Sequence, residues 1–241
     1  MGIIDLFRPK WRHSDPEVRR MAVEELKKQS VLIEVVKTDS DENIRRTALA
    51  KIDIAALGDE TLLCRIVDTD TSWENRLAAL ERVDAPKILA RAARRDANWF
   101  VRLEAVKWLD DQAVLITIAL TDENENVRIA AIRRLEDVDT LIRLVESDSN
   151  EWIREAAVEM LNDAATLRAA ALSDESRWVR LAATKKLDDQ ETLIQIAGSG
   201  DFRLVRQAAT RRINLLLKTR TGSPSVYGIK TKDSIDSIGC V

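Results

Sequence analysis

The residues of this 241-residue chain that are best suited to chemistry recur at a fixed spacing, as an Arg that in most copies has an Asp six positions before it. The arginines are Arg19, Arg45, Arg76, Arg102, Arg128, Arg154, Arg180 and Arg206, and the aspartates are Asp39, Asp70, Asp96, Asp122, Asp148 and Asp174. Guanidinium and carboxylate groups form bidentate ion pairs. One of each per repeat therefore predicts a structural ladder of pairs between successive repeats. The alternative is a row of arginines aimed at the phosphates or carboxylates of a ligand.

Little else in the sequence supports catalysis. His13 is the only histidine, and the two cysteines, Cys64 and Cys240, lie far apart along the chain. A zinc site would need carboxylates for most of its ligands, which is unusual, and no Ser-His-Asp or Cys-His pairing can be assembled convincingly. There is no Gly-rich phosphate loop. We therefore expect a protein that is not an enzyme and that has no cofactor or metal.

Four of the six tryptophans occupy similar places in the repeated phrase. Trp73 and Trp99 lie three residues before their Arg, and Trp152 and Trp178 lie two residues before theirs. Because tryptophan is enriched among interface hot spots, these four are the candidate partner-binding residues. The alternative is that each one covers the seam to the preceding repeat. Trp108 lies at a different place and is expected to pack near a turn.

The period of the phrase predicts the elements that carry these residues. The arginines recur every 26 residues, except for a step of 31 between Arg45 and Arg76. An Ala stands three positions after every Arg, and Leu, Ile or Val stands seven positions after it. Apolar residues at +3, +4 and +7 form one stripe of a helix. The Ala in every copy indicates a place where two backbones approach closely.

Each copy of the phrase also contains a start signal for its helix. Four positions before the Arg, in seven copies, stands a residue type that caps helices, at Asp15, Asp41, Ser72, Asn98, Asn124, Asn150 and Ser176. A second apolar set, beginning at residues such as Leu32 and Leu141, predicts a second and shorter helix after each first one. Isolated helices this short are marginal in water, so each helical hairpin must bury its stripe on its neighbours.

The phrase D-x-x-V-R-x-x-A-x-x-x-L, present as Asp15, Val18, Arg19, Ala22 and Leu26, resembles that of HEAT-like repeats. The resemblance covers about residues 13–217 and implies an all-α fold, a right-handed α-solenoid of about eight short hairpins. We expect an apolar and basic N-terminal cap over residues 1–14, the solenoid over 15–218 and a flexible tail over 219–241. The opening, LFRPKWRHSDPEVR, also looks like the start of bacterial HEAT-like proteins of unknown function.

Charge is distributed unevenly along the chain. The net charge is −3, but acidic groups outnumber basic ones by 34 to 23 over residues 29–202, whereas residues 203–232 hold no acidic group. Nucleic-acid binding needs clustered Lys and Arg, so only the basic C-terminal stretch could supply it. No apolar run approaches the ~20 residues of a membrane span. With two cysteines, no disulfide framework and no signal peptide, the sequence predicts a cytoplasmic protein.

These observations predict a non-catalytic repeat scaffold that binds another macromolecule, and we expect a protein partner on a concave face or a Trp-bearing rim. Two alternatives come from other HEAT-like folds. A DNA-repair glycosylase would need a basic concave face, and no motif specific to the chromophore lyases of phycobiliproteins is evident. The identity of the partner and the oligomeric state do not follow from the sequence.

Overall fold

The computed structural model describes residues 5, 7–53, 61–199 and 201–221. Over these residues it contains fifteen α-helices, one short 3-10 helix and no strand, which confirms the all-α prediction. The chain divides into two compact units, unit 1 (Met1–Asp111) and unit 2 (Gln112–Val241), and each is described by itself. Among the helices so described, none combines the length and the apolar composition that crossing a bilayer requires.

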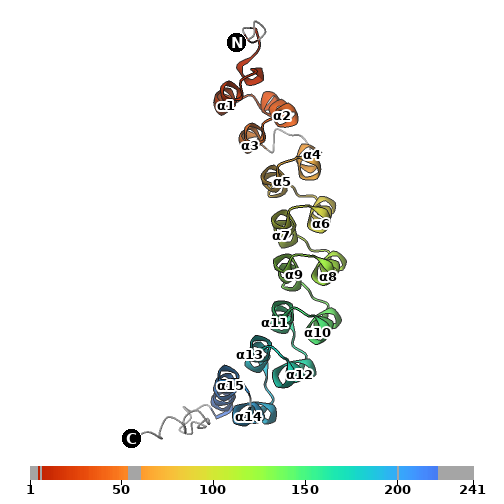
Figure 1. The fold of residues 1–241 in the computed structure, drawn as a ribbon, viewed down its shortest axis with the longest axis vertical. Coiled ribbons are helices and arrows are strands. Elements are labelled where there is room, and N and C mark those ends of the chain that lie inside the picture. The colour runs from red at the N-terminus through yellow and green to blue at the C-terminus, as the bar shows by residue number, and fades with distance from the viewer. Residues whose placement is uncertain (1–4, 6, 54–60, 200, 222–241) are drawn as a thin grey trace, which may run out of the picture. The chain divides into compact units, whose positions relative to one another are not determined.

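Unit 1 consists of two rows of helices (Figure 1). Its elements are η2 (Lys10–Arg12), α1 (Pro16–Glu25), α2 (Gln29–Thr38), α3 (Glu42–Lys51), α4 (Thr61–Thr69), α5 (Trp73–Leu80), α6 (Pro86–Arg95) and α7 (Trp99–Lys107). The odd-numbered helices pack successively on one another from α1 to α7, and α4 packs on α6 in the second row. The short helix η2 packs against α1.

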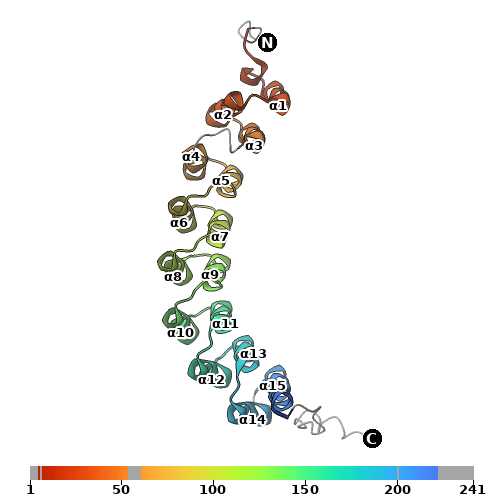
Figure 2. The same ribbon diagram turned by 180° about the vertical axis from the view of Figure 1, so that it is seen from behind.

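Unit 2 repeats this arrangement. Its helices are α8 (Gln112–Thr121), α9 (Glu125–Ile132), α10 (Val138–Ser147), α11 (Glu151–Met160), α12 (Ala164–Ser173), α13 (Arg177–Lys186), α14 (Gln190–Ser199) and α15 (Arg203–Thr221). Helices α9, α11, α13 and α15 form one row and α10, α12 and α14 pack in the other. Seen from either side, unit 2 curves so that the odd-numbered row lies on the inner side (Figures 1 and 2).

The closest helix pairs differ from the predicted hairpins. Each even-numbered helix packs most closely on the odd-numbered helix that follows it, as in α2 with α3 or α10 with α11. From the sequence, each first helix was expected to form a hairpin with the second helix that follows it, as α1 would with α2. The turn inside the observed pair contains the repeated Asp, whose carboxylate also binds the amide of the next helix cap, as Asp148 does for Asn150 at 2.9 Å. That bond helps to hold the two helices together.

The predicted caps stand at the N-termini of the first helices. The side chains of Asp15, Asp41, Asn98, Asn124, Asn150 and Ser176 accept a backbone N–H of the first helical turn. Ser72 stands at the same place, but its hydroxyl donates to Glu74 instead. These bonds satisfy amides that have no partner inside the helix, so the helix starts are local properties of the sequence.

The alanine column lies at the centre of the packing. Seven of its members are 0 % exposed: Ala48, Ala79, Ala105, Ala131, Ala157, Ala183 and Ala209. Ala22, in the first repeat, is only half-buried. A methyl group at this position lets the odd-numbered helices approach closely, because a larger side chain would separate their axes.

The structure differs from the sequence-based expectations in the length of the second helices and in the end of the last helix. The second helices are nine or ten residues long, about the length of most of the first ones, so the expectation that they are shorter was wrong. Helix α15 continues to Thr221, past the predicted end of the repeats at 218. The rest of the predicted tail, 222–241, parts of the predicted cap (residues 1–4 and 6) and residues 54–60 of the insertion lie outside the described residues.

Candidate functional site

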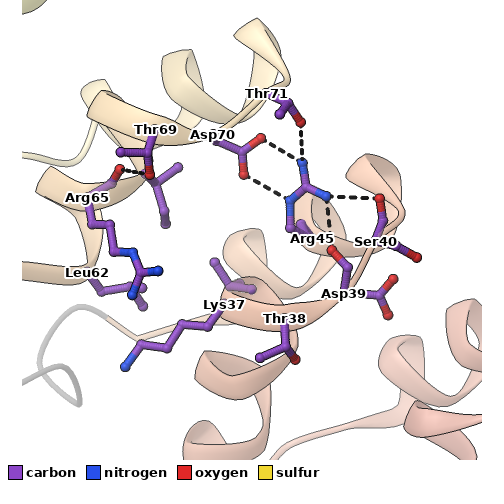
Figure 3. A pocket seen from close by; sticks show the side chains of 12 residues that line it. Lys37, Thr38, Asp39, Ser40, Arg45, Leu62, Arg65, Thr69, Asp70 and Thr71 are labelled. Carbon is purple, nitrogen blue, oxygen red and sulfur yellow. Dashed lines mark hydrogen bonds and ion pairs between the residues drawn. The ribbon is translucent and has the colours of Figure 1, made fainter.

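Arg45 shows how the repeated Arg and Asp residues are used (Figure 3). Its Nε and Nη2 donate to the two carboxylate oxygens of Asp70 at 2.9 and 2.8 Å. Its Nη1 donates to the carbonyl oxygens of Asp39 and Ser40 at 3.0 and 3.2 Å, and Nη2 also reaches the hydroxyl of Thr71 at 3.1 Å. All three nitrogens of the guanidinium are therefore engaged by the protein itself.

The same pairing recurs in both units. It is bidentate in Arg19–Asp39, Arg76–Asp96 and Arg154–Asp174, and Arg128 bonds Asp148 through one nitrogen. The aspartates also accept the backbone amide two residues later, at Asp39, Asp70, Asp96, Asp122, Asp148 and Asp174. At Asp39, Asp70, Asp96, Asp148 and Asp174 the carboxylate thus joins the Arg of the preceding repeat to the cap of its own helix.

Two predicted members of the ladder need separate description. Arg102 and Asp122 belong to different units, and within unit 1 Arg102 is buried and donates to the carbonyl oxygen of Asp96 at 2.9 Å. Arg180 donates to the carbonyl oxygen of Asp174 and pairs with Asp201 at 3.1 Å. The Asp201 side chain is well exposed, and it serves here because Gly200 occupies the usual Asp position.

The hydrogen bonds between Arg45 and Asp70 favour the ionised form of both partners. Burial alone would raise the pKa of Asp70, but the hydrogen bonds from Arg45 and from the Ser72 amide lower that pKa below its ordinary value. The hydrogen bond to Asp70 in turn raises the pKa of Arg45. Because these groups are mutually satisfied and mostly buried, the ladder positions successive helices and presents no row of free cations to a ligand.

A hollow of about 370 Å³ lies beside this pair, between the α2–α3 turn and α4. The Arg45–Asp70 pair forms one end of it, and Lys37 and Arg65 lie toward the other (Figure 3). Its polar groups include threonine hydroxyls that bond to their own helices, as Thr69 does to the Arg65 carbonyl oxygen. Among the residues that line this hollow, the structure shows no nucleophile in contact with a base.

The two candidate tryptophans of unit 1 contact a third aromatic ring. Trp73 and Trp99 are the first residues of α5 and α7. Both meet the ring of Phe100 edge to face, with centroids 6.0 and 5.6 Å away. The Trp73–Phe100 contact joins α5 to α7 and favours the seam-covering interpretation for Trp73. Trp99 and Phe100 are neighbours within α7, so their contact does not test that interpretation, and both tryptophan rings remain partly exposed.

The two candidate tryptophans of unit 2 lie on the solvent-facing side of its odd-numbered row. We call this surface the odd-row face of unit 2; residues on it include Ile129, Trp152, Glu155, Trp178, Leu181 and Leu204. Trp152 is 47 % exposed. Trp178 is half-buried, and the guanidinium of Arg177 lies 4.7 Å from its ring centroid. The structure therefore places these two rings on one continuous row of helices.

A first hollow on this face, hollow A, lies between α9 and α11 and has a volume of about 360 Å³. Trp152 lines it together with three carboxylates, those of Glu125, Glu155 and Glu159, and with Arg133, whose guanidinium lies 4.0 Å from the Glu159 carboxylate. Burial, and then the neighbouring Glu159, raise the pKa of Glu155, while Lys185 opposes the shift. A cationic or polar group of a ligand would relieve this repulsion.

A second hollow, hollow B, lies between α13 and α15 and has a volume of about 410 Å³. Its floor and walls are mainly apolar, with Leu181, Leu204 and Leu215 among the lining side chains. Leu204 and Leu215 are each about half exposed. The cationic residues that line the hollow are Lys185, Arg211 and Arg212. Hollow B can accept an apolar group that carries negative charge beside it.

The leucines and cations that line hollow B were not among the predicted site residues. The sequence does contain a pattern that indicates an exposed apolar stripe. Position −2 from the Arg holds Phe100, Trp152, Trp178 and Leu204 in four copies of the phrase. These residues lie off the buried stripe, so their apolar character marks a second, solvent-facing stripe. Grouping Trp73 and Trp99 with Trp152 and Trp178 obscured it, because adjacent helix positions differ by about 100° in direction. Trp108, expected to pack near a turn, is 61 % exposed.

No protein-family model and no curated protein matches this chain. Among the described residues, no group of three or more His, Cys, Asp and Glu side chains is placed to hold a metal ion. The odd-row face of unit 2 is therefore the candidate functional site on its geometry alone, as a surface suited to binding.

Proposed function

We propose that this chain is a non-catalytic HEAT-like repeat scaffold and that the odd-row face of unit 2 binds another protein. The observation that carries the proposal is the exposure of large apolar side chains, Trp152, Leu204 and Leu215, along one row of helices whose opposite side is fully packed. Large apolar side chains exposed together on one surface are typical of interaction sites on soluble proteins. Trp152 and Trp178 are the expected anchors, because aromatic side chains dominate interface energies.

The repeat architecture supports this role. The ladder and the alanine column hold the helices in place, so their surface is ordered before a partner binds. Binding then loses little further conformational entropy of this chain. A right-handed solenoid of about eight hairpins, which the resemblance to HEAT-like repeats implies, would extend such a surface along the chain. A location in the cytoplasm belongs to the same proposal.

The charges of the face favour a protein over a nucleic acid. Glu125, Glu155 and Glu159 line hollow A, where a phosphate backbone would be repelled. The cations of hollow B are interleaved with leucines and do not form a continuous track. A mixture of apolar, acidic and basic patches is what a protein surface complements. This argues against the glycosylase-type alternative, and no observation favours a tetrapyrrole.

Quantitative affinity capture from a native lysate tests the proposal. The baits are the full chain, a variant with Trp152→Ala and Trp178→Ala, and a matched variant with Trp108→Ala, which removes an equally large exposed ring elsewhere. We expect a defined protein, retained after nuclease treatment, that binds the first and third baits equally and the second at least ~10-fold more weakly. Equal retention by all three baits, or loss of the partner on nuclease treatment, would contradict the proposal.

A further inference from the structure

Hollow B combines exposed leucines with two cations, Lys185 and Arg211, that form no close ion pair among the described residues, although Lys185 is near enough to Glu155 to lower the pKa of that carboxyl. Leu204 and Leu215, both on α15, are each about half exposed in it. Lys185 and Arg211 also line it, and neither forms an ion pair with any residue that the structure describes. Arg212 differs, since it bonds to Asp188 and to the carbonyl oxygen of Leu187. An occupant of hollow B should therefore be apolar and should carry two negative charges.

One segment of the chain has this composition. After Asp201 the sequence has no acidic residue until Asp233 and Asp236, and these two alternate with two isoleucines in the run Asp-Ser-Ile-Asp-Ser-Ile over residues 233–238. We propose that residues 233–238 of the same chain occupy hollow B, with Ile235 and Ile238 on the leucines and the two aspartates beside Lys185 and Arg211. The contact would compete with the protein partner proposed above for Leu204 and Leu215, but its test does not require that partner.

The connecting chain is long enough for this contact. Helix α15 ends at Thr221, and thirteen residues separate it from Ile235, which can span up to about 45 Å when extended. Leu215 lies six residues before Thr221 and Leu204 seventeen, so at 1.5 Å per helical residue they are about 9 and 25 Å from the end of α15. Both leucines are within reach, and a tether of this length keeps its segment at a high effective concentration.

Occupancy of hollow B by residues 233–238 would cover the part of the odd-row face formed by α13 and α15. It would leave hollow A, between α9 and α11, open. Charge complementarity gives the contact its specificity, because Lys185 and Arg211 attract the carboxylates of Asp233 and Asp236.

Disulfide trapping in the full chain tests the proposal. With Cys64→Ser, Cys240 is the only native thiol and lies two residues beyond Ile238. A second thiol is introduced by Gln207→Cys, which lines hollow B, or in the control by Glu191→Cys, which is exposed on α14 in the other row. Rates of intramolecular disulfide formation with oxidised glutathione are divided by the separately measured reactivity of each thiol. We expect the bond to position 207 to form at least ~10-fold faster than the bond to position 191.

Charge reversal then separates docking from simple tethering. Asp233→Lys with Asp236→Lys, or Lys185→Glu with Arg211→Glu, should each remove the preference for position 207. The four substitutions together should restore it, because the ion pairs are re-formed with opposite signs. Equal normalised rates at positions 207 and 191 would overturn the proposal and would leave hollow B open for a separate acidic and apolar partner. A preference for position 207 that survives either charge reversal would overturn it as well.

Discussion

Glu155, on the odd-row face of unit 2, is a carboxyl whose ionisation the folded protein opposes. Burial raises its pKa first, and the charges of Glu159 and Glu151 add to the effect. A carboxyl whose pKa is higher in the folded than in the unfolded protein stabilises the fold most when it is protonated. That contribution is present below the unfolded value near 4.5 and is lost as the pH rises through the folded value. Hollow A therefore holds a charge that costs stability at neutral pH.

Glu155→Gln should raise the melting temperature at pH 7, because it removes the unfavourable ionisation and keeps the shape of the side chain. The gain should shrink toward zero below about pH 4, where the carboxyl is neutral in both states. Thermal unfolding followed by circular dichroism from pH 3.5 to 8 measures it. Glu146→Gln, at an exposed position on α10, is the control and should change little. A Glu155→Gln variant that is less stable at pH 7 would show that the carboxylate is favourably paired.

Asp70 tests the ladder, and Asp68 supplies a control from the same stretch of chain. Asp70 and Arg45 form a mostly buried pair, whereas Asp68 pairs with Arg91 at the surface. Asp70→Ala leaves a buried guanidinium without its carboxylate and should cost about 3 kcal/mol of unfolding free energy. Asp68→Ala should cost less than about 1 kcal/mol. Urea titration of the two variants measures the difference, and equal losses would mean that the ladder adds nothing beyond surface pairing.

The same Asp70 variant makes a prediction about pH. The pKa of Asp70 is lowered in the folded protein, so its stabilising effect is present above the unfolded pKa and is lost as the pH falls through the folded one. The gap between wild type and Asp70→Ala should therefore narrow below about pH 4. Both differences from wild type shrink at low pH, but they have opposite signs at pH 7. Glu155→Gln removes a carboxylate whose charge is unfavourable in the folded protein, whereas Asp70→Ala removes a carboxylate whose charge is favourably paired.

At the scale of the helices, close packing of the odd-numbered row depends on the alanine column. Ala157 of α11 is 0 % exposed and lies between α9 and α13. Ala157→Leu adds three carbons where two helices meet and should destabilise the chain by about 1–3 kcal/mol. Ala169→Leu, at an exposed position of α12, should change stability by less than about 0.5 kcal/mol. Chemical denaturation of both variants provides the comparison, and a harmless Ala157→Leu would refute close approach at this column.

Much of this element-scale structure could be predicted because its signals are local or periodic. A cap residue such as Asn150 and a stripe such as Ala157 with Leu161 lie within one helix, so the sequence displays them directly. The pairing of even-numbered helices with the next odd-numbered helix could not be predicted in this way. The repeat period shows that first and second helices alternate along the chain. It does not show whether a second helix packs more closely on the first helix before it or on the one after it. Hollow B is likewise formed by side chains of two helices, α13 and α15, and appears only when they are packed.

At the scale of the whole molecule, the interface between the two rows of helices differs in composition from the solvent-facing side of the odd-numbered row. Between the rows, aliphatic and alanine side chains form the core, and the ladder fixes the order of the helices. The free side of the odd-numbered row in unit 2 carries Trp152, Trp178 and the leucines of hollow B, which contribute little to that core. A protein that only needed to fold would gain nothing from exposing them, and this is why we regard the face as the functional surface.

The central claim is that a partner covers the odd-row face of unit 2, and oxidative footprinting of the complex tests it most directly. Hydroxyl radicals label exposed tryptophan rings, and mass spectrometry reports the extent at each position with and without the captured partner. The account predicts that the partner lowers labelling of Trp152 and Trp178 and leaves Trp108 unchanged. Unchanged labelling of Trp152 and Trp178 in a saturated complex, or protection of Trp108 in their place, would contradict it.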